Sequence, residues 1–66
     1  MNIYHLKILN GADTFYVDVH ANLLSWSEAG LYEFTLISPD NVPQKIAYYP
    51  VNSTIIQSIE YDVKHN

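Results

Sequence analysis

The alternation of apolar and polar residues constrains the fold of this chain more than any other feature. Apolar side chains recur at every second position, as in half-buried strands, and not with the period of about 3.6 that marks a helix. No amphipathic helix of about ten residues can be placed anywhere in the chain. The alternation predicts five strands, at residues 2–9, 14–21, 31–37, 44–49 and 55–64.

The first two predicted strands have well-defined inner faces. Tyr4, Leu6 and Ile8 share one face of the first, and Phe15, Val17, Val19 and Ala21 share one face of the second. A four-residue loop at 10–13 places Ile8 opposite Phe15 and keeps both apolar sets on one side of the sheet. A two-residue loop at Asn10 and Gly11 preserves this parity too, so two registers remain open.

Turn chemistry separates the later strands. The segment 38–41 has Pro39 in the second position of a turn, followed by Asp40 and Asn41. Pro50 ends the fourth strand because proline cannot donate to a ladder, and 50–54 then forms one tight turn. The segment 22–30 has neither clean alternation nor a helical stripe, so we expect a packed loop in which Leu23, Leu24 and Trp26 have no assigned place.

The size of the chain and the order of its strands indicate one small domain. A chain of 66 residues without cysteine can form one core, which packing or association with another chain must stabilise. Five short strands in meander order leave two exposed edges unless the sheet closes. We therefore expect an all-β fold, a strongly bent five-stranded antiparallel meander closing into a small SH3-like barrel.

This strand order, with the short turn at 50–54 before the last strand, resembles that of SH3-like and Sm-like barrel proteins. It also resembles small uncharacterised barrels of bacteriophages and mobile elements, many of which bind host proteins. The resemblance implies a phage or prophage protein that acts on a protein of the host.

Composition and charge disfavour several classes of partner. Three lysines, no arginine and seven carboxylates leave a net charge of −4, which opposes binding to phosphate backbones. A nucleic-acid-binding barrel would need Lys7, Lys45 and Lys64 to cluster. No signal-like segment and no apolar run of about 18 residues is present, so we expect a cytoplasmic protein without a membrane span.

No motif in the chain indicates catalysis or metal binding. His5, His20 and His65 are the candidate acid-base or metal groups. The four-residue loop places His5 opposite Asp18 and His20 one pair further along, opposite Ile3, which allows a cluster of His5, Asp18 and His20 on the outward face. The chain lacks short histidine ligand spacings, a Gly-x-Ser-x-Gly motif and a phosphate-binding glycine loop. The sequence therefore predicts a non-enzyme without metal or cofactor.

A surplus of aromatic residues on an acidic scaffold favours a protein-protein interaction module, of the inhibitor or adaptor type. Tyrosine and tryptophan bring large contact areas with a polar tip to interfaces. The predicted partner-binding residues are Tyr16, Asp18, Trp26, Glu28, Glu33, Tyr48 and Tyr49. The alternative is a homo-oligomer that assembles through the exposed edge of the strand at 55–64.

Overall fold

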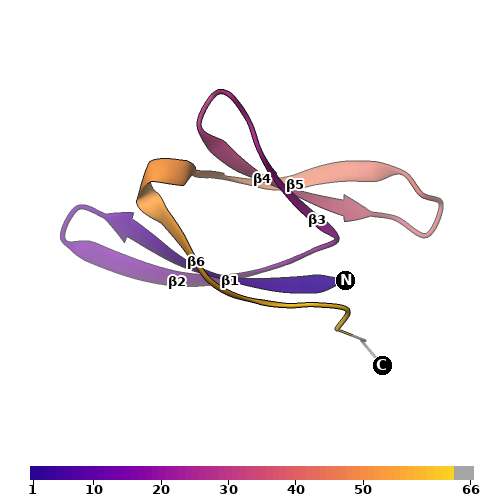
Figure 1. Ribbon diagram of the computed structural model, residues 1–66, viewed down its shortest axis with the longest axis horizontal. Coiled ribbons are helices and arrows are strands. Elements are labelled where there is room, and N and C mark those ends of the chain that lie inside the picture. The colour runs from indigo at the N-terminus through magenta and orange to yellow at the C-terminus, as the bar shows by residue number, and fades with distance from the viewer. Residues whose placement is uncertain (64–66) are drawn as a thin grey trace.

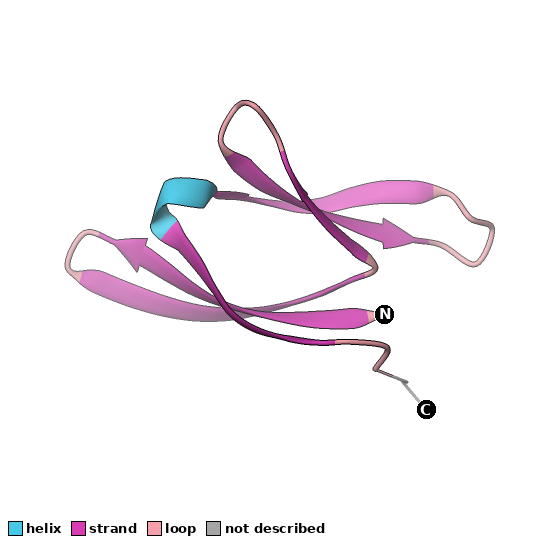
Figure 2. Cartoon of the chain, viewed as in Figure 1, coloured by secondary structure: helices cyan, strands magenta, loops and turns pink. Residues whose placement is uncertain are grey.

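The computed structural model describes residues 1–63 and shows an all-β chain (Figure 1). One single-turn 3-10 helix interrupts the strands (Figure 2). The elements in chain order are β1 (Asn2–Asn10), β2 (Asp13–Ala21), β3 (Leu23–Trp26), β4 (Leu31–Ile37), β5 (Pro43–Pro50), η1 (Val51–Ser53) and β6 (Thr54–Glu60).

The predicted five-stranded meander that closes into a barrel is wrong. The strands form two three-stranded antiparallel sheets, which we call sheet A (order β2-β1-β6) and sheet B (order β3-β4-β5). β5 and β6 stay at the edges of different sheets, with η1 between them. β5 begins at Pro43 and ends at Pro50, and proline at a strand end cannot donate the hydrogen bond that further pairing would need.

The chain passes from sheet A to sheet B at Asn22, inside the segment predicted to be a packed loop. The Asn22 N–H donates to the Thr35 carbonyl at 2.8 Å, and its Oδ1 atom accepts from the Ile37 N–H, also at 2.8 Å. The Asn22 carbonyl accepts from the Asn2 side chain at 3.2 Å. Asn22 thus bonds to both sheets, and the next four residues pair with β4 as strand β3.

The first hairpin follows the register set by the predicted four-residue loop. Ile8 lies opposite Phe15, and the pairing continues outward until Asn10 lies opposite Asp13. Gly11, in the remaining tight turn, has a φ of 61°, a conformation that glycine adopts without steric cost. The alternative loop at Asn10 and Gly11 does not occur.

Strand β6 departs from the strict alternation expected for 55–64. Leu6 lies opposite Ile56 and His5 lies opposite Ser58, so Gln57 is an extra residue in a β-bulge. The bulge brings Ile56 and Ile59 onto the same inner face, although their sequence spacing is three. The strand ends at Glu60, before Asp62 adopts a φ of 53°, and residue 64 of the predicted strand lies outside the described part.

A small core lies where the two sheets overlap. The rings of Tyr4 in sheet A and Phe34 in sheet B form a T-shaped pair with centroids 5.1 Å apart, and the rings of Phe34 and Tyr49 form another at 6.0 Å. The fully or nearly fully buried apolar residues are Tyr4, Leu6, Val19, Ala21 and Phe34.

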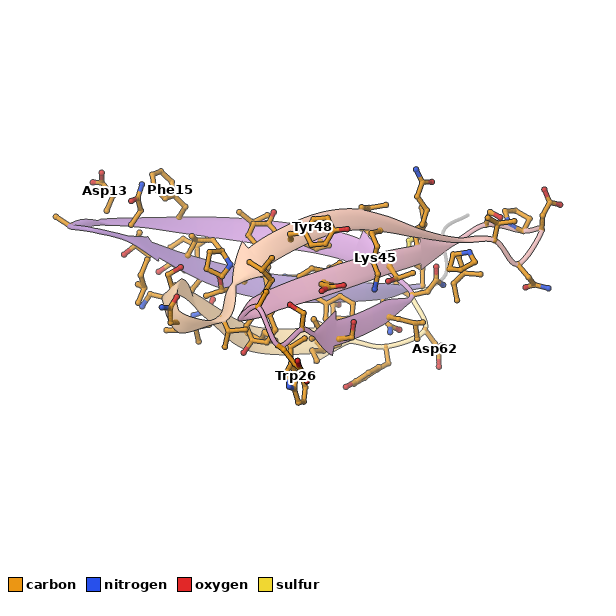
Figure 3. All side chains as sticks on the ribbon, turned by 90° about the horizontal axis from the view of Figure 1, so that it is seen from above. Asp13, Phe15, Trp26, Lys45, Tyr48 and Asp62 are labelled. Atoms are coloured by element: carbon orange, nitrogen blue, oxygen red, sulfur yellow. The ribbon has the colours of Figure 1, made fainter. Side chains whose placement is uncertain are left out.

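The hairpins of the two sheets extend in opposite directions beyond this overlap (Figure 1). Phe15, which the sequence predicts to point inward, lies near the tip of the β1–β2 hairpin (Figure 3). It is 49% exposed there because no strand of sheet B covers that end. Few side chains are therefore buried in a chain with a large apolar content.

Candidate functional site

An apolar pocket opens between the two sheets on one side of the molecule. Its volume is about 260 Å³. β3 and β6, each at an edge of its sheet, lie on the same side of the molecule in the two views of Figures 1 and 3. The pocket is lined by Leu24, Trp26, Tyr32, Val51 and Ile56.

The pairing of the strands explains why these side chains converge. Leu24 lies opposite the buried Phe34, and Trp26 lies opposite Tyr32, so Leu24 and Trp26 share the inner face of sheet B. Ile56 reaches the inner face of sheet A because it pairs with Leu6.

η1 adds the last wall of the pocket. The Val51 N–H donates to the Gly30 carbonyl at 2.9 Å, which joins η1 to the turn between β3 and β4. Gly30 has a φ of 81°, a left-handed conformation that favours glycine in this turn. This hydrogen bond therefore keeps η1 and the turn next to each other beside the pocket.

Trp26, the single tryptophan of the chain, is the most exposed of the large apolar side chains at 75%. Figure 3 shows it directed away from the body of the molecule, at the edge formed by β3. An indole that is exposed beside an apolar pocket has a large area left to bury on contact with another molecule. The wall of the pocket that Trp26 forms is therefore exposed to solvent.

A second cluster lies on the outer face of sheet A and joins its three strands. His5 on β1 places its Nδ1 atom 2.7 Å from Asp18 Oδ1 on β2 and its Nε2 atom 2.6 Å from Glu60 Oε2 on β6. The hydrogen bond to Glu60, followed by the one to Asp18, raises the pKa of His5 above its usual value of 6.5. Both interactions favour the imidazolium form.

We call His5, Asp18 and Glu60 the clip, because their two hydrogen bonds join β1 to both of its neighbouring strands. The two nitrogens of an imidazole lie on opposite sides of the ring, so the two carboxylates do not converge on one point. Within residues 1–63 no group of three histidine, cysteine or acidic side chains is arranged to hold a metal ion. The predicted position of His5 opposite Asp18 is confirmed, as is that of His20 opposite Ile3.

The histidine cluster differs from the predicted one in its third member. Glu60, and not His20, bonds to the second ring nitrogen of His5. No local pattern relates Glu60 to His5, because the contact depends on the pairing of the last strand with the first. His65 lies outside the described residues.

The predicted partner-binding residues do not form one patch. Tyr16 and Asp18 lie on β2, where Tyr16 is opposite Lys7 and Asp18 bonds to His5. Glu33 and Tyr48 lie opposite each other in sheet B, and Glu33 forms an ion pair with Lys45 at 3.1 Å. These pairs lie on different sheets.

The remaining predicted residues lie at the pocket or in the core. Trp26 lines the pocket, and Glu28 is exposed in the turn that follows it. Tyr49 is half-buried against Phe34, whereas its neighbour Tyr48 is exposed. As predicted for a consecutive pair on a strand, one of the two tyrosines points outward.

Sequence reasoning identified one of the five residues that line the pocket. That residue is Trp26, which had been predicted to bind a partner. Leu24 had no assigned place, and Tyr32, Val51 and Ile56 had no predicted role in binding. A stretch with three large apolar side chains but no periodicity was the available signal. This stretch indicated apolar surface that the predicted barrel left unburied.

The fold and the pocket define an all-β protein of two stacked three-stranded sheets with an apolar site between two edge strands. Comparisons with protein-family models, curated proteins and solved structures find no match for this chain. The resemblance to SH3-like, Sm-like and phage barrel proteins therefore stays a prediction. No helix within residues 1–63 is long and apolar enough to cross a membrane.

Proposed function

We propose that this protein is a non-enzymatic protein-interaction module whose pocket receives an apolar side chain of a partner protein. The observation that carries the proposal is the 75% exposure of Trp26 at the wall of an otherwise apolar pocket. Tryptophan and tyrosine in desolvated pockets supply most of the binding energy at many protein interfaces.

The size and lining of the pocket favour a protein partner over a small-molecule substrate. Its volume of about 260 Å³ lies just under the range of about 300 to 1,000 Å³ typical of small-molecule sites. Apart from the Tyr32 hydroxyl, the side chains that line it carry no group able to accept a hydrogen bond. Burial of an apolar side chain is the main interaction that such a site offers.

The distribution of charge supports a partner with cationic residues beside its apolar anchor. The chain carries a net charge of −4. Lys45 is paired with Glu33, and Lys7 lies opposite the exposed Tyr16, so neither lysine lines the pocket. Glu28 lies two residues after Trp26 and is exposed. Electrostatic complementarity of this kind mainly raises association rates and specificity.

Selection from a library of linear peptides displayed on phage tests the proposal. We expect selected peptides to share a large apolar residue and to shift the fluorescence of Trp26 to shorter wavelength, because binding removes the indole from water. Since the chain has one tryptophan, this signal reports on the pocket alone.

Calorimetry on two variants supplies the control. W26A should weaken the selected peptides by about 30-fold or more, the loss typical of an interface hot spot. Y16A removes an aromatic side chain that is 69% exposed on a different strand, and it should change the affinity less than about twofold. Equal losses in both variants, or selected peptides that leave the Trp26 fluorescence unchanged, would refute the proposed site.

A further inference from the structure

We infer that the partner segment binds as an additional antiparallel strand on the free edge of β6, with an apolar side chain in the pocket and basic residues at its N-terminal end. This inference rests on the proposed function and specifies its binding mode. Peptides that extend a sheet gain affinity from main-chain hydrogen bonds and specificity from the pockets that receive alternate side chains.

The free edges of the two sheets differ in how they are protected against strand addition. β5 carries Pro43 and Pro50 at its ends and Lys45 between them, and proline and lysine are common devices that prevent pairing. β3 has only four residues. The two edge strands of sheet A, β6 with seven residues and β2 with nine, carry neither proline nor lysine and pair within the described residues only with β1. β6 differs from β2 in that it contributes a residue, Ile56, to the pocket.

The edge of β6 also borders the pocket. Ile56 is part of both, while Leu24 and Trp26 form the facing wall on β3. A strand added beyond β6 would extend sheet A beside Ile56, which lines the pocket. Because successive side chains of a strand alternate between its faces, every second side chain of the added segment would point toward sheet B and the pocket.

The charges along β6 determine where a cationic residue would bind. Glu60, which also bonds to His5, ends the strand and the exposed Asp62 follows it, so two carboxylates lie at the C-terminal end of β6. At the other end, Lys7 lies opposite Ile55 on the neighbouring strand. A partner lysine or arginine is attracted to the Glu60 end and repelled from the Lys7 end.

The direction of the added strand follows from the sheets already present. Every described pair of neighbouring strands is antiparallel, and antiparallel pairing is slightly more stable per residue than parallel pairing. An antiparallel segment places its N-terminus beside the C-terminal end of β6. Its basic residues therefore precede its apolar anchor in sequence.

Four synthetic ten-residue peptides test this binding mode against the wild-type chain. The first alternates valine with threonine after an N-terminal lysine pair. In the second the lysine pair is at the C-terminus, in the third glutamates replace the lysines, and in the fourth proline replaces a central threonine. Affinity is measured by Trp26 fluorescence and by calorimetry, and amide hydrogen exchange locates the contact.

The first peptide should bind best, with exchange of β6 amides slowed and exchange in β5 unchanged. The C-terminal lysine and glutamate versions should bind about two- to tenfold more weakly, and the proline version should show no saturable binding. D62N should remove about half of the preference for the N-terminal lysine pair, and asparagine tolerates the positive φ of this position.

Three outcomes would overturn strand addition. Equal binding of the proline peptide would mean that an apolar side chain alone enters the pocket, and the proposed function would stand. Failure of all four peptides, while library-selected peptides still bind at Trp26, would have the same meaning. Light scattering that shows a dimer, with β6 amides protected in the free protein, would assign the edge to a second copy of the chain.

Discussion

The Nε2 atom of His5 lies 2.6 Å from the Oε2 atom of Glu60, a residue 55 positions later in the chain. With the 2.7 Å contact between His5 and Asp18, this bond forms a polar clip across all three strands of sheet A. The clip is charge-assisted when the imidazole is protonated. Its strength therefore depends on pH in the range where histidine titrates.

The stabilising effect of His5 should decrease as pH rises. Because the pKa of His5 is higher in the folded than in the unfolded state, its contribution is fully present below about pH 6.5 and is lost through the folded-state pKa. The difference in unfolding free energy between wild type and H5Q should be larger at about pH 5.5 than at about pH 9.

Denaturant unfolding at the two pH values measures this difference. Titration of the His5 ring protons by NMR adds a direct reading, in which E60Q should lower the pKa more than D18N because Glu60 makes the larger contribution. A difference between wild type and H5Q that stays constant across this pH range would show that the clip does not couple protonation to folding.

Phe34 should contribute far more to stability than Phe15, although both are phenylalanines in strands. F34A removes a ring that is 0% exposed and contacts Tyr4 and Tyr49, so it should cost about 3 to 5 kcal/mol. A domain this small has little stability beyond that, and F34A should be largely unfolded.

F15A is the matched control, because it removes the same side chain from the exposed end of the first hairpin. It should cost less than about 1 kcal/mol. Circular dichroism during urea unfolding measures both variants. Similar losses would mean that the hairpin tip is covered in solution, for instance by another molecule.

The link between the two sheets should be sensitive to the side chain at position 22. N22A leaves the Ile37 N–H without its side-chain acceptor and should destabilise the protein by about 1 to 3 kcal/mol. N22D retains an acceptor oxygen in the same place and should cost less. Thermal unfolding of the two variants compares them, and an equal cost would assign the effect to something other than this hydrogen bond.

Thr54 offers a substitution that should stabilise the protein. Its hydroxyl is buried and, among the described residues, has no hydrogen-bond partner. T54V replaces the hydroxyl by a methyl group of similar size, so it should remove a desolvation penalty and add about 1 kcal/mol to the unfolding free energy. S53A, at the preceding half-buried position, is the control and should have a small effect. A loss of stability in T54V would show that the hydroxyl is paired in solution.

Local pattern in the sequence determined the all-β class, the apolar faces of β1 and β2, and the register of the first hairpin up to one alternative. It also determined the turn before β5, where the Asn41 N–H donates to the Ser38 carbonyl at 2.9 Å, and the single turn after Pro50. These features follow from interactions between residues close in sequence. Alternation and turn propensity report on such interactions directly.

Tertiary structure alone decided the division into two sheets, the bulge at Gln57 and the bond between His5 and Glu60. Each depends on residues far apart in the chain, such as Asn22 with Ile37 or His5 with Glu60. The pocket also depends on residues far apart in the chain, because Trp26, Val51 and Ile56 meet only after two edge strands come to lie on one side of the molecule. Sequence periodicity shows which face of a strand is apolar, but not which other strand will cover it.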